Sequence, residues 1–103
     1  MSRVFIVQSE PGRMDFRAAE RFGELFFVME PRDSVFRLDD ALNKLSQRLS
    51  SFGSDDYLLQ VGHPSMIGLA TALIADQTQG QFRILQWLGR EREYIPISVK
   101  LWN

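Results

Sequence analysis

The chain has no cysteine and a single histidine, His63, among its 103 residues. Without cysteine it can form no disulfide, no thiolate metal site and no thiol nucleophile. One histidine also excludes a multi-histidine metal site within one chain. Because no other catalytic set of residues stands out, we expect no metal, no cofactor and no enzymatic activity.

Lysine is scarce as well: Lys44 and Lys100 are the only lysines among the 12 basic residues, and the formal net charge is −1. This balance argues against bulk attraction to nucleic acid or to acidic lipid. Long hydrophobic runs are also missing. The apolar stretch Val4–Val7 is too short for a signal peptide, and no segment approaches the roughly 20 apolar residues of a membrane span. We expect a soluble, intracellular protein.

What is present is enough for one core. Hydrophobic residues make up 45% of the chain and aromatic residues 12%, which predicts a single folded domain over residues 1–103. The chain is organised around Tyr57–Gln77. Tyr57–Val61 is apolar without alternation and predicts a buried strand. Gly62, His63 and Pro64 predict a tight turn, and the helix that follows to Gln77 is apolar in nearly every direction, so we expect it to be buried on most sides.

Other segments complete the pattern. Helices are predicted at Asp15–Phe22 and Asp39–Phe52, and strands at Arg3–Gln8, Glu24–Glu30, Phe82–Leu88 and Glu93–Leu101. The order β-α-β-α-β-α-β-β predicts a small three-layer α/β domain with a mostly parallel sheet and a C-terminal antiparallel hairpin.

The last strand has two predicted properties. Pro96 cannot donate a ladder hydrogen bond, so we expect this strand at an edge of the sheet. Its alternation predicts one buried face and one exposed face. The predicted buried face holds Ile95, Ile97, Val99 and Leu101, and the predicted exposed face holds Tyr94, Pro96, Ser98 and Lys100.

Part of the chain resembles a known group. The stretch Tyr57-Leu58-Leu59, Val61-Gly62, Pro64 and Ile67-Gly68-Leu69-Ala70 continues to Gly80, Ile84-Leu85, Trp87 and Tyr94-Ile95-Pro96-Ile97. It resembles small proteins of tailed bacteriophages with a core of roughly YLLxxGDPxxIGxA…LKWDRxxxxYxPI, over the C-terminal half. That group has no established activity, so the resemblance implies a viral origin and a shared fold rather than a function. Because we expect no signal peptide and no membrane span, we expect the protein in the host cytoplasm. His63 and Leu88 stand where the group carries acidic residues, so a role resting on those carboxylates does not transfer.

Two loops predict an anion site. The turn at Gly62–Ser65 follows a strand and opens a helix, a geometry in which backbone N–H groups receive anions. If the first and central strands are neighbours, Ser9–Arg13 lies beside it at the carboxyl edge of the sheet. A phosphate would then contact Gly12, Arg13, Gly62, His63 and Ser65. The simpler interpretation is an ordinary strand–helix turn, because the sequence matches neither common phosphate-binding motif.

Arginines form a second candidate surface. Arg13, Arg17 and Arg21 recur every four residues, and Arg90 and Arg92 follow near the C-terminus. These side chains would meet phosphates of a nucleic acid. Interleaved carboxylates instead favour a solvated face held by ion pairs.

Aromatic residues of the last hairpin form a third candidate surface. Trp87, Tyr94 and Trp102, with Arg90 and Arg92, would mark a contact surface if they are exposed. The alternative is that they close the rim of the core.

Three functions follow. The first is a non-enzymatic interaction protein that binds a host or phage protein and self-associates, for example as a homodimer through its edge strand. The second is a nucleotide- or phosphate-binding domain that uses the loops Ser9–Arg13 and Gly62–Ser65. The third is a nucleic-acid-binding accessory protein.

Overall fold

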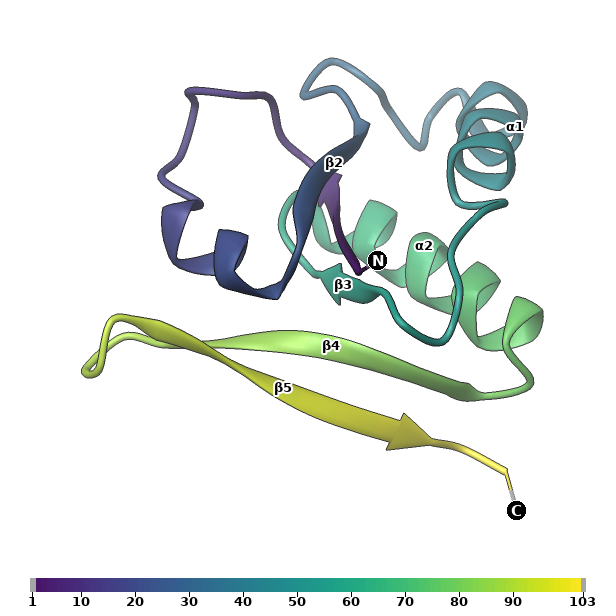
Figure 1. The fold of residues 1–103 in the computed structure, drawn as a ribbon. Coiled ribbons are helices and arrows are strands. Elements are labelled where there is room, and N and C mark those ends of the chain that lie inside the picture. The colour runs from purple at the N-terminus through teal and green to yellow at the C-terminus, as the bar shows by residue number, and fades with distance from the viewer. Residues whose placement is uncertain (1, 103) are drawn as a thin grey trace.

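The computed structural model describes residues 2–102. Its elements are β1 (Arg3–Gln8), the 3-10 helix η1 (Arg17–Phe22), β2 (Glu24–Met29), α1 (Leu38–Arg48), β3 (Tyr57–Leu59), α2 (Pro64–Gln77), β4 (Gln81–Leu88) and β5 (Glu93–Lys100). The five strands form one sheet in the order β2-β1-β3-β4-β5 (Figure 1). The pairs up to β4 are parallel, and β5 is antiparallel to β4. The predicted α/β fold with its C-terminal hairpin is confirmed.

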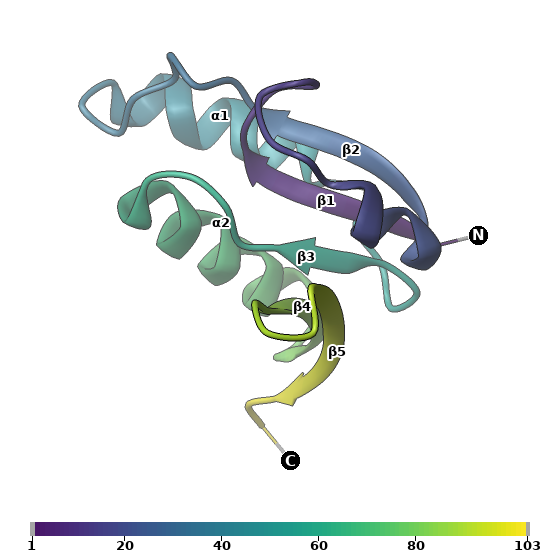
Figure 2. The same ribbon diagram turned by 90° about the vertical axis from the view of Figure 1, so that its left-hand side faces the viewer.

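The sheet is covered on both faces (Figure 2). Helices α1 and α2 pack on one side, against Phe5 and Val7 of β1, while η1 packs on the other, against Val4 and Ile6. All four of these β1 side chains are fully buried. A central strand covered on both faces needs no alternation of polar and apolar residues, which explains the continuous apolar run Val4–Val7 in β1.

The third layer is thinner than predicted. The segment predicted as a helix over Asp15–Phe22 is a 3-10 helix over Arg17–Phe22, in which the N–H of Ala19 donates to Phe16 O at 2.9 Å. Asp15 lies outside it and accepts a hydrogen bond from the N–H of Arg17 at 3.0 Å. This local side-chain bond competes with an α-helical start.

Helix α1 also ends before the predicted Phe52, at Arg48. The carbonyl oxygens of Leu49 and Phe52 accept hydrogen bonds from the side-chain amide of Gln77 at 2.9 and 3.1 Å. A residue of α2 therefore satisfies carbonyl groups of the loop after α1, and the polar end of α2 has a structural role that its sequence did not indicate.

The burial predicted for β5 and α2 was wrong in part. Val99 packs against the core and four residues of α2 are buried, but Ile95 and Ile97 are each 40% exposed and Leu101 is 56% exposed. Tyr94, predicted to face solvent, is buried, and on α2 Gly68 and Ala72 are exposed. Within residues 2–102 the two α-helices on this face pack over β1, β2 and β4, which leaves most of this face of β5 and the outer side of α2 uncovered.

A buried carboxylate fixes the entry to β3. Asp56 is 4% exposed and accepts hydrogen bonds from the N–H groups of Arg3 (3.0 Å) and Gly53 (2.8 Å) and from the Arg3 guanidinium (3.2 Å). It thereby joins the start of β1 to the loop before β3.

Replacing Asp56 with alanine should therefore lower the free energy of unfolding by about 2–4 kcal/mol, because two backbone donors lose their acceptor. The neighbouring Asp55 is exposed, so Asp55→Ala should change it by only about 0.5 kcal/mol. Urea unfolding followed by circular dichroism measures both. Equal stabilities of the two variants would contradict this role of Asp56.

No helix within residues 2–102 has the length and apolar character needed to cross a membrane.

Candidate functional site

The carboxyl ends of β1 and β3 lie side by side where the chain changes direction across the sheet. From β1 the chain passes through η1 on one face to β2, and then through α1 on the opposite face to β3, on the other side of β1. Open α/β sheets bind ligands in the crevice at such a switch point. The condition set for the predicted anion site, that the first and central strands are neighbours, is met.

Gln8, at the end of β1, ties two loops to this strand. Gln8 is 4% exposed, and its amide nitrogen donates to the carbonyl oxygens of Glu30 (3.1 Å) and Asp33 (2.9 Å). Its side-chain oxygen accepts a hydrogen bond from the N–H of His63 at 3.1 Å. The loops that follow β2 and β3 are thus fixed to the end of β1 by one amide group. The sequence indicates Gln8 only as the polar end of an apolar strand.

Gly62 lies directly against Gln8. Its φ of +127° is a conformation that residues with a side chain rarely adopt. A Cβ atom there would lie 2.4 Å from Cβ of Gln8 and 3.2 Å from its backbone oxygen. Only glycine therefore lets the turn after β3 pack this closely on β1.

The loop after β1 contains a tight turn. The N–H of Arg13 donates to Glu10 O at 3.2 Å, and Gly12 between them has a φ of +85°. Pro11 and Gly12 hold the second and third positions, as in a type II turn. This turn places Arg13 next to Gly62 and His63.

A hollow of about 310 Å³ lies between these loops and contains three of the five residues predicted to hold an anion, namely Arg13, Gly62 and His63. Gly12 does not line it. Ser65 lines an adjacent hollow of about 340 Å³, which is also lined by His63. Ser9, which the sequence did not single out, lines the first hollow. Its hydroxyl group is buried and has no hydrogen-bond partner within residues 2–102.

A further hollow, of about 460 Å³, lies beyond β2 and is strongly charged. Burial would raise the pKa of Asp33, but hydrogen bonds from the Lys44 ammonium (2.8 Å) and the Glu30 N–H (2.8 Å) outweigh it and lower that pKa. Lys44 also lies 3.6 Å from the Glu30 carboxylate. Lys44 thus pairs with two carboxylates, whereas Arg13 pairs with one, that of Glu10 at 3.4 Å, so this hollow is a less suitable anion site than the one at Arg13.

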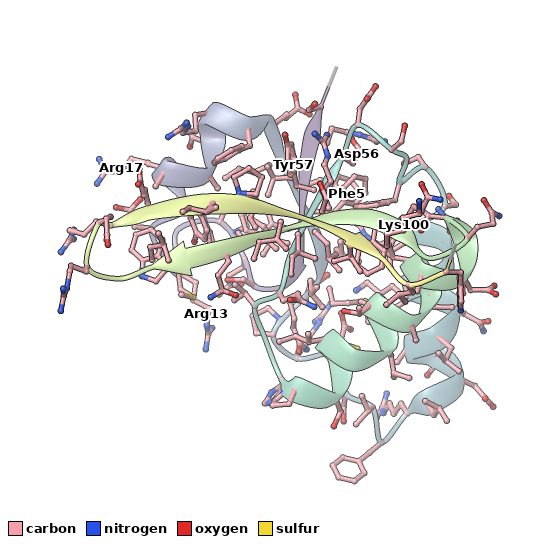
Figure 3. All side chains as sticks on the ribbon, turned by 90° about the horizontal axis from the view of Figure 1, so that it is seen from below. Phe5, Arg13, Arg17, Asp56, Tyr57 and Lys100 are labelled. Atoms are coloured by element: carbon pink, nitrogen blue, oxygen red, sulfur yellow. The ribbon has the colours of Figure 1, made fainter. Side chains whose placement is uncertain are left out.

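The predicted row of arginines does not form. Arg13 lies in the turn and Arg17 in η1, and their side chains lie well apart in Figure 3. Each arginine also faces a carboxylate: Arg13 lies 3.4 Å from Glu10, Arg17 lies 2.8 Å from Asp15 and Arg21 lies 3.9 Å from Glu93. The hydrogen bond from Arg17 lowers the pKa of Asp15 to about 2. This arrangement agrees with a solvated, ion-paired surface.

The three aromatic residues predicted to form a contact surface lie at two separate positions. Trp87 and Tyr94 face each other across the hairpin with their ring centres 4.8 Å apart. Tyr94 is buried in the cluster under η1, and burial, with a smaller effect of the Asp15 charge, raises its pKa. Trp102 lies against Gly80, at the other end of β5. Arg90 and Arg92 lie exposed in the turn between the strands.

Comparison with known proteins gives one match. No curated protein and no solved structure matches the chain. The profile of one family, described as phage Pam3 gp32-like protein, matches residues 2–101. It covers nearly the whole sequence, and it confirms the resemblance at the level of a phage protein family, while the specific motif stays a prediction. The chain belongs to the phage Pam3 gp32-like protein family.

Proposed function

We propose that this phage protein acts without catalysis, by binding an extended segment of a host or phage protein along the free edge of β5. The observation that supports this most is that β5 ends the sheet with exposed apolar side chains beside its unpaired edge. Viewed from below, β5 lies in front of the other elements of residues 2–102 (Figure 3). Strand addition at such an edge is a common way to bind a peptide.

The hydrogen-bond pattern identifies the groups that a partner would meet. The N–H of Leu101 donates to Gly80 O at 2.9 Å, so the odd-numbered residues of β5 direct their backbone groups toward β4. The even-numbered residues direct theirs outward. Tyr94, Ser98 and Lys100 therefore offer outward N–H groups. Pro96 is also at an outward position, so its missing N–H group removes no hydrogen bond to β4.

The opposite edge of the sheet is better protected. There the carbonyl oxygen of Phe27 in β2 accepts a hydrogen bond from Arg48 of α1 at 2.9 Å. The same guanidinium lies 5.1 Å from the centre of the Phe26 ring. A helix side chain thus covers part of the β2 edge, as native proteins commonly do to prevent unwanted strand pairing. On β5 the devices of this kind are Pro96 and the charged Lys100, and no hydrogen bond from a helix side chain to the β5 backbone occurs within residues 2–102.

The side chains beside the edge indicate the chemistry of the partner. Ile95 and Ile97 lie on the same face of β5, and each is 40% exposed. On an added strand, alternate residues would lie next to them. We therefore expect an extended segment with apolar side chains at alternate positions.

The substitution Ser98→Pro tests this proposal. It removes an outward N–H group and adds a ring at the edge, while the ladder toward β4 keeps its donors. Recovery of the partner from phage-infected lysate should fall by about fivefold or more, because one backbone hydrogen bond is lost and the edge is blocked. Affinity capture with mass spectrometry, in the presence of nuclease, measures the recovery.

Ser98→Thr is the matched control, since it keeps the N–H group and should keep the partner. If the proline variant folds poorly, Ile97→Thr replaces it as the test, because it reduces the apolar surface without altering the backbone and should also lower the recovery of the partner. Equal recovery by wild type, Ser98→Pro and Ile97→Thr would contradict the proposal. If the recovered partner is a second copy of the chain, gel filtration will show a larger species for the wild type that Ser98→Pro abolishes.

A phosphate-binding function is the second candidate. It is supported by the hollow at the switch point, which brings Arg13, Gly62 and His63 together. A nucleic-acid-binding function receives less support, because the arginines proposed for it do not form one row, and Arg17 and Arg21 each face a carboxylate.

A further inference from the structure

Two hollows adjoin each other beside Met14. The first is the hollow of about 310 Å³ at the switch point. The second, of about 370 Å³, lies on the η1 side of the sheet, where β3 and β4 end. Both are lined by Met14 and Val61, so a single ligand of moderate size would reach both.

The first hollow has the chemistry of an anion site. Arg13 and His63 line it, and the Arg13 guanidinium has an exposed carboxylate, that of Glu10, at 3.4 Å as its partner, which an anion would have to displace or share. Helix α2 begins next to the hollow at Pro64 with no acidic residue in its first turn. The positive end of the helix dipole is therefore not compensated there. Independently of the helix, Ser9 is among the residues that line this hollow, and its buried hydroxyl group has no partner within residues 2–102. Most buried polar side-chain atoms do have a hydrogen-bond partner, so a ligand or a water molecule at this position would complete the site.

The second hollow has the chemistry of a site for a flat ring. Trp87 and Tyr94 supply aromatic surface, and Leu59, Leu85 and Met14 supply apolar surface. The polar groups at its border are Asp15, Gln60 and Gln86. The Gln60 side chain itself is directed toward α2 on the opposite face, where its amide nitrogen donates to Thr71 at 3.0 Å. The aromatic and apolar surface is therefore what this hollow offers, and stacking on aromatic side chains is a common way for proteins to hold a nucleobase.

We infer that the two hollows together bind a mononucleotide, with the phosphate beside Arg13 and His63 and the base between Met14 and Trp87. This inference rests on the second candidate function, the phosphate site, and names its ligand class. It does not involve the outward edge of β5. The Ser98→Pro variant should therefore bind nucleotides like the wild type, so the two proposals can fail separately.

Fluorescence provides a specific test. The chain has two tryptophans, and Trp102 lies at the far end of β5, so the variant Trp102→Phe leaves Trp87 as the only reporter. Titration with AMP, GMP, CMP and UMP should give saturable quenching by at least one of them below about 1 mM. The corresponding nucleoside should bind about tenfold more weakly or worse, because it lacks the charged group that Arg13 would contact.

Within the Trp102→Phe background, Arg13→Gln should weaken nucleotide binding by about tenfold or more, since it removes a charge-assisted contact. Arg90→Gln, an exposed arginine of the hairpin turn that lies in neither hollow, is the matched control and should leave binding within about twofold. The inference is overturned if none of the four nucleotides quenches saturably, if the nucleoside binds as well as the nucleotide, or if Arg13→Gln and Arg90→Gln behave alike.

Discussion

Replacing Gly62 with alanine should lower the free energy of unfolding by about 3 kcal/mol or more. Two costs add. The φ of +127° is strained for any residue with a Cβ atom, at about 1–3 kcal/mol. The new methyl group would also lie 2.4 Å from Cβ of Gln8, and overpacking of this kind costs about 1–3 kcal/mol. Gln8 cannot move aside without breaking hydrogen bonds to Glu30, Asp33 and His63.

Gly12→Ala separates the two costs. Gly12 also has a positive φ, +85°, but no atom lies within 4 Å of the position where its Cβ would be. Only the backbone strain remains, so the loss should be about 1–2 kcal/mol. Urea unfolding of the two variants, with unchanged slopes, measures the difference. If both variants lose the same stability, the close contact between Gly62 and Gln8 has no energetic importance.

The substitution Gln8→Glu should destabilise the protein at pH 7 by about 3–5 kcal/mol. It replaces a buried amide that donates to two carbonyl oxygens with a carboxylate that faces them, and an unpaired buried charge costs about this much. Burial should raise the pKa of the new carboxyl group in the folded state. The folded protein then binds more protons than the unfolded chain, so stability falls as the pH rises above the ordinary glutamate pKa of about 4.3.

The loss should therefore be smaller near pH 4, where the protonated acid can donate one hydrogen bond, than at pH 7. Gln86→Glu is the control, since Gln86 is exposed on β4 and the change should stay within about 0.5 kcal/mol at both pH values. Urea unfolding at pH 4 and pH 7 measures both variants relative to wild type. A loss for Gln8→Glu that does not depend on pH would mean that its carboxylate reaches solvent.

Elements with a strong local pattern could be predicted from the sequence. The apolar run Arg3–Gln8 and the segment Pro64–Gln77 have the predicted bounds. The strand predicted over Tyr57–Val61 ends at Leu59. There the N–H of Val61 donates to the carbonyl oxygen of Leu59, which makes a turn, and the carbonyl oxygen of Val61 accepts a hydrogen bond from the N–H of Gln8. That ending depends on a neighbouring strand, and no local pattern encodes it.

The candidate site could be predicted only in part, for the same reason. Gly62, His63 and Arg13 were identified from turn chemistry and do lie together. The importance of Gln8 depends on carbonyl groups more than 20 residues away, and it appears only when β2 and β3 are placed on either side of β1. The exposure of Ile95 and Ile97 depends on how many helices cover the sheet, which strand alternation does not indicate.

The most direct test of the central proposal is amide hydrogen exchange at Ser98 and Lys100, measured in the protein alone and in the complex captured from infected lysate. If a partner strand adds to β5, these two outward N–H groups become hydrogen-bonded, and their exchange should slow by about tenfold or more. The inward N–H of Val99, which faces β4, should change much less. Unchanged exchange at Ser98 and Lys100, with protection elsewhere on the surface, would contradict binding at this edge.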